Sequence, residues 1–210
     1  MIERLPKTGA IRLDRIEAAR ESGAAHLASL GILGPVVGIS PGAAYGNAKR
    51  WLPERFAESA VTVCGAGSRP AVVVFGSSSE RPMCEQVVEA LRHSGIETRN
   101  LAGETTLREF IDLTAACRLF LTNDSGAMHV ASALAVPTVA VFGATDDTTT
   151  GPTGPLARVV REHTECSPCL LRDCPIDHRC MTRVSAAQVA TVALELREES
   201  APAWTHEARS

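Results

Sequence analysis

Four short, continuous apolar runs, separated by stretches long enough for helices, constrain the fold of this chain more than any other feature. They lie at residues 36–39, 71–75, 119–122 and 138–141. Strands that are buried on both faces read as unbroken apolar runs, because helices cover both sides of a parallel sheet. Helices are expected at residues 12–30, 53–66, 82–93, 106–117, 125–135 and 185–199, with another strand at 96–101. The alternation predicts an α/β protein with a Rossmann-like parallel sheet and helices on both faces.

Two of the expected helices begin with a capping-box pattern, in which a hydroxyl residue is followed three positions later by Glu or Gln. Thr106 and Glu109 form one such pair, and Ser185 and Gln188 form the other. The two side chains of such a pair satisfy backbone N–H groups that the first turn of a helix leaves free. These pairs therefore predict where the two helices begin.

Charge and composition exclude several functional classes. The net charge is −3 and only 4% of residues are aromatic, so neither a basic surface nor stacking platforms for nucleic acid are expected. The chain has no apolar run of about 18 residues, and we expect no membrane span. Its charged start does not read as a secretory signal. These features predict a cytoplasmic protein with reduced cysteines, and no motif calls for a cofactor.

Three expected strand-to-helix junctions are rich in glycine, serine and polar residues. They lie at residues 40–49, 76–80 and 123–129. In a parallel α/β sheet, ligands bind in the crevice outside the carboxyl ends of the strands. The three junctions together therefore predict a site for a phosphate-bearing ligand.

The junction at 123–129 reads NDSGAMH and contains four candidate binding residues: Asp124, Ser125, Gly126 and His129. A helix that begins near Ser125 would direct free N–H groups and the positive end of its dipole at an anion. Gly126 would allow close approach, and His129 lies one turn further on. The alternative is that Asp124 or Ser125 only caps the helix and that His129 is a half-buried structural residue.

The junction at 40–49 supplies cations at its end. Lys49, with Arg50 as a second cation, could bind a diphosphate beside a turn made by Gly42 and Gly46. The segment is not a Walker A loop, because no Ser or Thr follows Lys49, and it lacks the G-x-G-x-x-G dinucleotide pattern. A purely structural loop with surface cations is the alternative, and Trp51 is expected in the core.

In the junction at 76–80, Glu80 is the candidate. A carboxylate just past a strand end commonly accepts a hydrogen bond from a ribose hydroxyl. The alternative is an acidic residue in the first turn of a helix, where it interacts favourably with the dipole.

The seven cysteines fall into two groups. The scattered ones, Cys64, Cys84 and Cys117, are expected to pack in the core. The others follow the spacing C-x2-C-x4-C-x5-C, at Cys166, Cys169, Cys174 and Cys180. Four thiolates can hold a structural zinc, but a zinc ribbon has two C-x2-C knuckles and this segment has one. A metal site, disulfides and reduced packing cysteines all remain open, and no catalytic role is expected.

Taken in order along the chain, these motifs resemble the ADP-heptose glycosyltransferases of family 9. The resemblance rests on PGAAYGNAKRWLPERFAE, FGSSSE, LTNDSGAMHVASALAVPTVAVFGATD and CSPCLLRDCPIDHRC, and it spans residues 36–198. It implies the C-terminal domain of a GT-B glycosyltransferase, with residues 35–198 binding ADP-heptose. Residues 1–34 would be an N-terminal helix left from the interdomain region, and residues 199–210 a disordered tail.

The resemblance also implies a role for each candidate residue. Lys49 would hold the diphosphate, and Ser125 and Gly126 would bind it through their backbone amides. Asp124 would contact the transferred sugar or orient the turn. The two less specific assignments place His129 at the phosphates and Glu80 at the ribose.

The implied reaction transfers heptose to the lipopolysaccharide inner core, with inversion and release of ADP. It would occur in the cytoplasm, at the inner face of the inner membrane, where peripheral membrane contact is expected. Family enzymes carry an acceptor domain and a catalytic base ahead of this region, and about 35 residues leave no room for them here. We therefore expect a fragment that binds ADP or ADP-sugar and transfers poorly. A non-catalytic nucleotide-binding module and a same-fold transferase with another donor are the alternatives.

Overall fold

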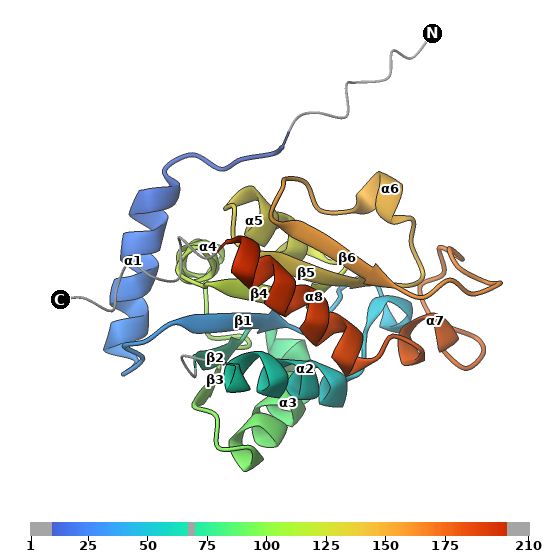
Figure 1. Ribbon diagram of the computed structural model, residues 1–210, viewed down its shortest axis with the longest axis horizontal. Coiled ribbons are helices and arrows are strands. Elements are labelled where there is room, and N and C mark those ends of the chain that lie inside the picture. The colour runs from blue at the N-terminus through green and yellow to red at the C-terminus, as the bar shows by residue number, and fades with distance from the viewer. Residues whose placement is uncertain (1–9, 67–69, 201–210) are drawn as a thin grey trace, which may run out of the picture.

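The computed structural model describes residues 10–66 and 70–200, and its centre is one parallel sheet (Figure 1). The sheet has six strands in the order β3-β2-β1-β4-β5-β6, and all neighbouring pairs are parallel. The strands are β1 (Val36–Ser40), β2 (Ala71–Val74), β3 (Thr98–Asn100), β4 (Leu119–Asn123), β5 (Thr138–Phe142) and β6 (Ala157–Arg161). The predicted Rossmann-like sheet is confirmed.

Alternate residues of each strand point into two separate cores. Val37 and Ile39 of β1 pack into one core, while Val36 packs into the other. In β4, Leu121 lies in the first core and Phe120 in the second. Successive side chains of a strand point to opposite faces, so a sheet covered on both sides needs apolar residues at every position. This requirement explains the unbroken apolar runs in the sequence.

Three helices cover one face of the sheet: α2 (Pro53–Gly65), α3 (Arg81–His93) and α8 (Ala186–Glu199). Pro53 stands in the first turn of α2, where its missing N–H has no cost. The capping box at the start of α8 forms as predicted: the Ser185 hydroxyl accepts from the Gln188 N–H at 3.2 Å, and Gln188 Oε1 accepts from the Ser185 N–H at 2.7 Å.

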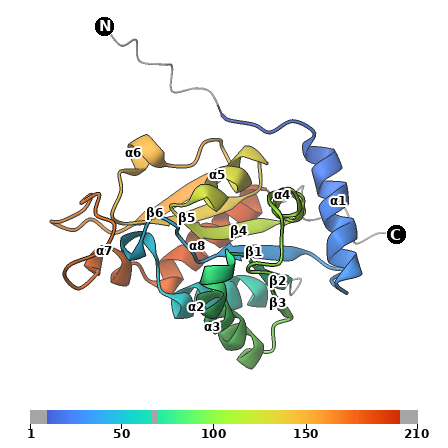
Figure 2. The same ribbon diagram turned by 180° about the vertical axis from the view of Figure 1, so that it is seen from behind.

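The opposite face carries α1 (Ile16–Ser29), α4 (Leu107–Ala115) and α5 (Gly126–Ala133), which are in front in the reverse view of Figure 2. Helix α1, the N-terminal helix expected over residues 12–30, packs against α4. A Cβ atom at Gly23 would lie 1.9 Å from the Asp112 carbonyl oxygen, so the two backbones meet where no side chain intervenes. The predicted capping box of Thr106 and Glu109 starts α4.

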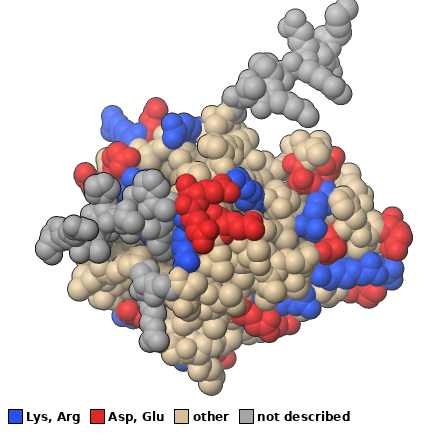
Figure 3. Space-filling model, viewed as in Figure 1, with Lys and Arg blue, Asp and Glu red and all other residues tan. Residues whose placement is uncertain are grey.

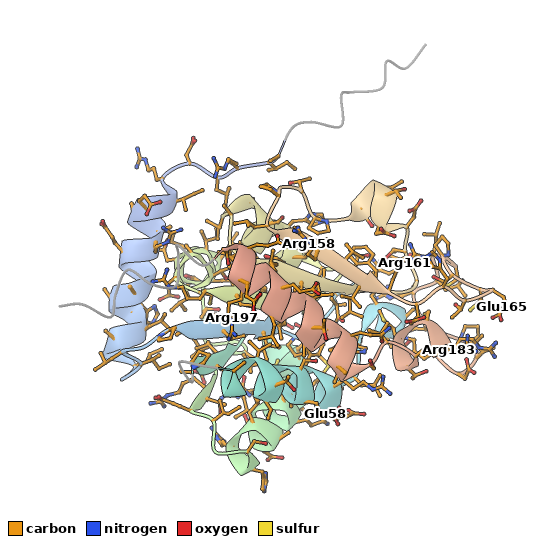
Figure 4. The ribbon with its side chains drawn as sticks, viewed as in Figure 1. Glu58, Arg158, Arg161, Glu165, Arg183 and Arg197 are labelled. Carbon is orange, nitrogen blue, oxygen red and sulfur yellow. The ribbon has the colours of Figure 1, made fainter. Side chains whose placement is uncertain are left out.

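The sixth strand, β6, is absent from the sequence predictions. Its residues ARVVR mix charged and apolar side chains because β6 is an edge strand, and only Val160 is fully buried. Arg158 of β6, labelled in Figure 4, pairs with Glu199 of α8 at 2.5 Å. Two short helices, α6 (Asp147–Thr150) and α7 (Arg179–Thr182), also lie where the sequence predicts neither a helix nor a strand.

Two surface observations complete the description. On the face shown in Figure 3, Lys and Arg side chains are interspersed with Asp and Glu, and they form no broad basic field. Among residues 10–66 and 70–200, no helix has the length and apolar character that crossing a bilayer requires. The tail expected to be disordered lies, apart from Glu199 and Ser200, outside the described residues.

Candidate functional site

The carboxyl ends of β1, β2 and β4 bring the three glycine- and serine-rich junctions together. These strands are neighbours, with β1 in the middle. Their junctions line one cavity of about 450 Å³, to which Gly42, Glu80, Ser125 and Gly126 all contribute. The predicted convergence at one edge of the sheet is therefore observed.

A fourth segment, residues 105–110, forms a wall of the same cavity and was missed from the sequence. It contributes Thr105, Thr106, Leu107 and Phe110, at the start of α4. None of these four lining residues is a glycine or a cation, and the capping-box pattern at Thr106 gave the segment a purely structural explanation. Their position after β3, one strand further out, brings them to the same edge.

Lys49 and Asp124 do not line this cavity, although the next residue after each, Arg50 and Ser125, does. The Lys49 ammonium is paired with the buried Asp124 carboxylate. Lys49 Nζ is 2.6 Å from Asp124 Oδ2, and the Thr145 hydroxyl donates to the same oxygen at 2.6 Å. Asp124 is only 5% exposed, and Lys49 Nζ also lies 5.1 Å from the centre of the Tyr45 ring. A buried carboxylate needs such partners to offset its lost hydration. Thr145, from the turn after β5, was not predicted.

Asn123 has a structural role that the sequence did not reveal. Its side chain is fully buried; Nδ2 donates to the Pro41 carbonyl at 2.6 Å, and Oδ1 accepts from the Trp51 N–H at 3.0 Å. The amide therefore ties both ends of the loop that carries Lys49 to the end of β4. Trp51 is buried, as predicted.

Helix α5 begins at the cavity. Ser125 is its N-cap residue, but no side-chain capping bond forms, and the Asp124 carboxylate is directed to Lys49 instead. The capping alternative therefore does not explain these two residues. An added Cβ at Gly126 meets no atom within 4 Å, so the cavity is open there. Free N–H groups of a first helical turn favour an anion.

His129 and Glu80 occupy different environments. His129 is exposed and is not part of the cavity wall. Glu80 lines the cavity, and its Oε2 accepts from the Ser77 N–H and hydroxyl, each at 2.8 Å. Its Oε1 lies 2.2 Å from where a Cβ of Gly42 would be, so glycine leaves room for the carboxylate. Glu80 thus acts as a cap and also lines the cavity.

Arg50 holds the loop rather than projecting from it. Its guanidinium donates to the Ala43 carbonyl through Nε at 3.2 Å and Nη2 at 3.1 Å. The side chain still lines the cavity, so its positive charge lies at the wall. Its role as a second cation for a diphosphate stays a prediction, and the structure adds the contact with Ala43.

The seven cysteines are free in the structure. Cys64, Cys84 and Cys117 are buried, as predicted, and burial raises the pKa of the Cys84 thiol to about 12. Burial, together with the nearby Cys166, Cys169 and Cys174, raises the pKa of Cys180 to about 11. Within the described residues, no three or more His, Cys, Asp or Glu side chains are arranged to hold a metal ion. The metal alternative thus gains no support.

A second cavity, of about 320 Å³, lies at the opposite side of the sheet, near the amino ends of β1, β4 and β5. It is lined mainly by apolar residues of α1 and of the turns that precede β1, β4 and β5. It contains neither a carboxylate nor a glycine- and serine-rich turn. The cavity at the carboxyl ends of the strands therefore suits a polar ligand better than this one.

Comparison with known proteins identifies the family to which this chain belongs. A model described as "Glycosyltransferase family 9 (heptosyltransferase)" matches residues 7–179. The lipooligosaccharide heptosyltransferase 2 of Campylobacter jejuni is 34% identical over 168 residues, covering 79% of this chain and 52% of that protein. The lipopolysaccharide heptosyltransferase 2 of Escherichia coli is 42% identical over 128 residues, covering 60% of this chain and 36% of that protein.

A solved structure shares the fold. The ADP-heptose heptosyltransferase II of Escherichia coli superposes with a TM-score of 0.76 at 32% identity, covering 90% of this chain and 54% of that one. The chain therefore spans about half the length of the Campylobacter protein and of this structure.

Proposed function

The chain belongs to glycosyltransferase family 9, and from this premise we propose that it provides the nucleotide-sugar half of a heptosyltransferase with ADP-heptose as donor. A solved relative at 32% identity is described as an ADP-heptose enzyme, which supports the choice of donor. We propose the lipopolysaccharide inner core as acceptor, and the cytoplasmic side of the inner membrane as the place of reaction.

One observation carries the proposal. The start of α5, the Glu80 carboxylate and the glycine-containing loop after β1 line one cavity, and the Lys49 ammonium pairs with Asp124, the residue before Ser125 in its wall. A nucleoside diphosphate needs anion-binding amides, a cation and a carboxylate for ribose hydroxyls. These groups come from segments of the chain as far apart as Gly42 and Gly126, so a purely structural need of one helix end does not explain their convergence.

Each residue then has a role in donor binding. The amides at Ser125 and Gly126 and the ammonium of Lys49 bind the diphosphate, and Asp124 holds Lys49 or contacts the transferred sugar. Glu80 Oε1 accepts from the ribose. We also propose that His129 contacts the phosphates, although it lies outside the cavity wall.

The catalytic contribution of these residues is electrostatic. As the bond between heptose and the diphosphate breaks, negative charge accumulates on the leaving ADP. We propose that the amides at the start of α5 and the Lys49 ammonium stabilise this charge. The acceptor hydroxyl attacks from the opposite side of the sugar and gives its proton to a base that the acceptor half of the enzyme would supply. The configuration at the anomeric carbon inverts, and ADP leaves.

Calorimetric titration with ADP tests the proposal. We expect wild-type protein to bind ADP in preference to UDP and GDP, and Lys49→Ala to weaken ADP binding at least about tenfold, because a charge-assisted hydrogen bond contributes about 1.5–3 kcal/mol. Gly126→Val should weaken binding similarly, since its side chain would occupy the open space at the helix start.

Arg92→Ala is the matched control, because this cation pairs with Glu85 on α3 at 3.1 Å, away from the cavity. Unchanged ADP affinity in both site variants would refute the site. Tighter binding of UDP or GDP would indicate a same-fold transferase with another donor. ADP binding that no added acceptor half converts into transfer would indicate a non-catalytic nucleotide-binding module.

A further inference from the structure

The cysteine-rich segment, residues 166–180, has no role in the site described above, yet it lies against the loop that carries Lys49. It connects β6 to α7 at one end of the molecule (Figures 1 and 2). Glu165 and Arg183, which flank it, lie at this end in Figure 4. We call residues 41–50 the Lys49 loop.

Four hydrogen bonds join the segment to the short helical turn Asn47–Lys49, and one of them runs from the Asn47 N–H to Asp173 Oδ1 at 3.4 Å. The Ala48 N–H donates to the Arg172 carbonyl at 3.1 Å, and the Cys174 N–H donates to Asn47 Oδ1 at 3.0 Å. His178 Nε2 donates to the Ala48 carbonyl at 3.2 Å. Both backbone groups of the residue before Lys49 are therefore held by the cysteine-rich segment.

Tyr45 links the segment to Lys49 itself. Its hydroxyl donates to the Leu170 carbonyl at 3.4 Å, and its ring centre lies 5.1 Å from Lys49 Nζ. At Gly46, where φ is 157°, a Cβ would lie 2.1 Å from the Arg172 carbonyl oxygen. The segment thus approaches so closely that only glycine fits there.

The segment is itself anchored to the sheet. The Leu170 N–H donates to the Ala144 carbonyl at 2.8 Å, and the Ser167 hydroxyl donates to the Gly143 carbonyl. These carbonyls immediately precede Thr145, which binds Asp124. The cysteine-rich segment therefore connects the turn after β5 to the Lys49 loop, the two places that determine the position of the Lys49–Asp124 pair.

Little else holds the middle of the Lys49 loop. Among the described residues, every hydrogen bond that joins residues 44–48 to a distant part of the chain ends on residues 170–178. Asn123 and Arg50 hold only the two ends, at Pro41, Ala43 and Trp51. A loop with so few contacts of its own opens easily once its partners are removed.

We propose that the cysteine-rich segment is the positioning element of the Lys49 loop, and that its contacts with Asn47 and Ala48 set the affinity for the donor diphosphate. The inference rests on the proposed function, because it assumes that Lys49 binds the diphosphate. Asn47 is a positioning residue, which acts through Lys49 and does not touch the ligand.

The variant Asn47→Ala tests this role. It removes the acceptor of the Cys174 N–H, and we expect it to weaken ADP binding about fivefold, the effect of one net hydrogen bond. In a Lys49→Ala background the same change should have no further effect on ADP affinity, because there is no ammonium left to position. The Ala48 N–H, followed by NMR hydrogen exchange without ligand, should exchange about fivefold faster in Asn47→Ala.

A second pair of variants separates positioning from general damage. Asp173→Ala removes the oxygen that accepts from the Asn47 N–H at 3.4 Å, and it should weaken ADP binding about twofold, whereas Asp173→Asn keeps that oxygen and should restore affinity. Asp177→Ala is the control, since Asp177 pairs with Arg179 within the segment and should leave ADP affinity unchanged.

Each outcome bears on one idea. Wild-type affinity in Asn47→Ala, or an equal loss in the Lys49→Ala background, would overturn the inference. Failure of wild-type protein to bind ADP would overturn the proposed function, and the exchange rate of the Ala48 N–H would then show by itself whether the segment holds the loop. An unchanged exchange rate would contradict the inference whatever ADP does.

Discussion

At the scale of single residues, the most informative group is the Asp124 carboxylate with its two donors. Lys49 and Thr145 both reach the same oxygen at 2.6 Å, and the carboxylate is only 5% exposed. A charge so far from water depends on its partners, so each of them determines where the others lie. The position of the Lys49 ammonium is therefore a property of three segments, after β1, β4 and β5.

Thr145→Val removes one donor while keeping the size of the side chain. We expect the free energy of unfolding to fall by about 2 kcal/mol, because a hydrogen bond to a charged group is lost in a buried place. Urea unfolding measures this change, and Thr145→Ser should recover most of it.

Thr148→Val is the matched control for this prediction. Its hydroxyl also donates to an aspartate, Asp146, at 2.8 Å, but Thr148 is exposed. Its stability should stay close to that of wild type. An equal loss in Thr145→Val and Thr148→Val would show that burial of the Asp124 group is not the cause.

At the scale of elements, helices α1 and α4 pack so closely that no side chain fits between them at Gly23. Gly23 lies in the middle of α1, where glycine costs a helix about 1 kcal/mol relative to alanine. Close packing offsets this cost, because the backbone of α4 occupies the space that a side chain at Gly23 would need. Close approach of the two helices brings Ala19 and Leu27 into the core on that face.

Gly23→Ala should therefore destabilise the protein although alanine is the better helix former. The new Cβ would lie 1.9 Å from the Asp112 carbonyl oxygen, so the helices must separate, with an expected loss of about 1–3 kcal/mol. Thermal and urea unfolding both report this loss.

Gly65→Ala, at the end of α2, serves as the comparison. No described atom lies within 4 Å of a Cβ there, so the same substitution should be neutral or should stabilise by up to about 1 kcal/mol. A Gly23→Ala protein as stable as wild type would show that α1 can shift without loss of packing.

At the scale of the whole molecule, one edge of the sheet collects every group proposed to act on the donor. Four junctions open onto the same cavity because the strands are parallel and their carboxyl ends lie together. The chain spans about half the length of the relatives to which it is similar. Donor binding can therefore be tested on these residues separately from transfer.

Residues 35–198 should bind ADP. At 100 times the Kd, ADP should stabilise this domain by about 2.7 kcal/mol. For a domain of this size that corresponds to a rise in Tm of roughly 5–10 °C. Differential scanning calorimetry measures the shift. An unchanged Tm at that ADP concentration would contradict the assignment of these residues to donor binding.

Sequence patterns were sufficient for the fold because its signals are local. Unbroken apolar runs predicted β1, β2, β4 and β5, and the capping boxes of Thr106 and Ser185 predicted where α4 and α8 begin. Strand β6 escaped because an edge strand needs few apolar residues. The candidate residues at the carboxyl edge followed from the rule that parallel strands end together.

The amino-acid sequence by itself determined the parallel sheet, the family and the three junctions that meet at one edge. Only the tertiary structure decided that Thr145 and Asp124 hold Lys49, that residues 105–110 complete the cavity, and that His129 lies outside its wall. Local periodicity records which face of an element is buried. It does not show that Lys49 and Thr145 both bind the same oxygen of Asp124. Such contacts depend on how strands and loops that are far apart in the chain are placed in space.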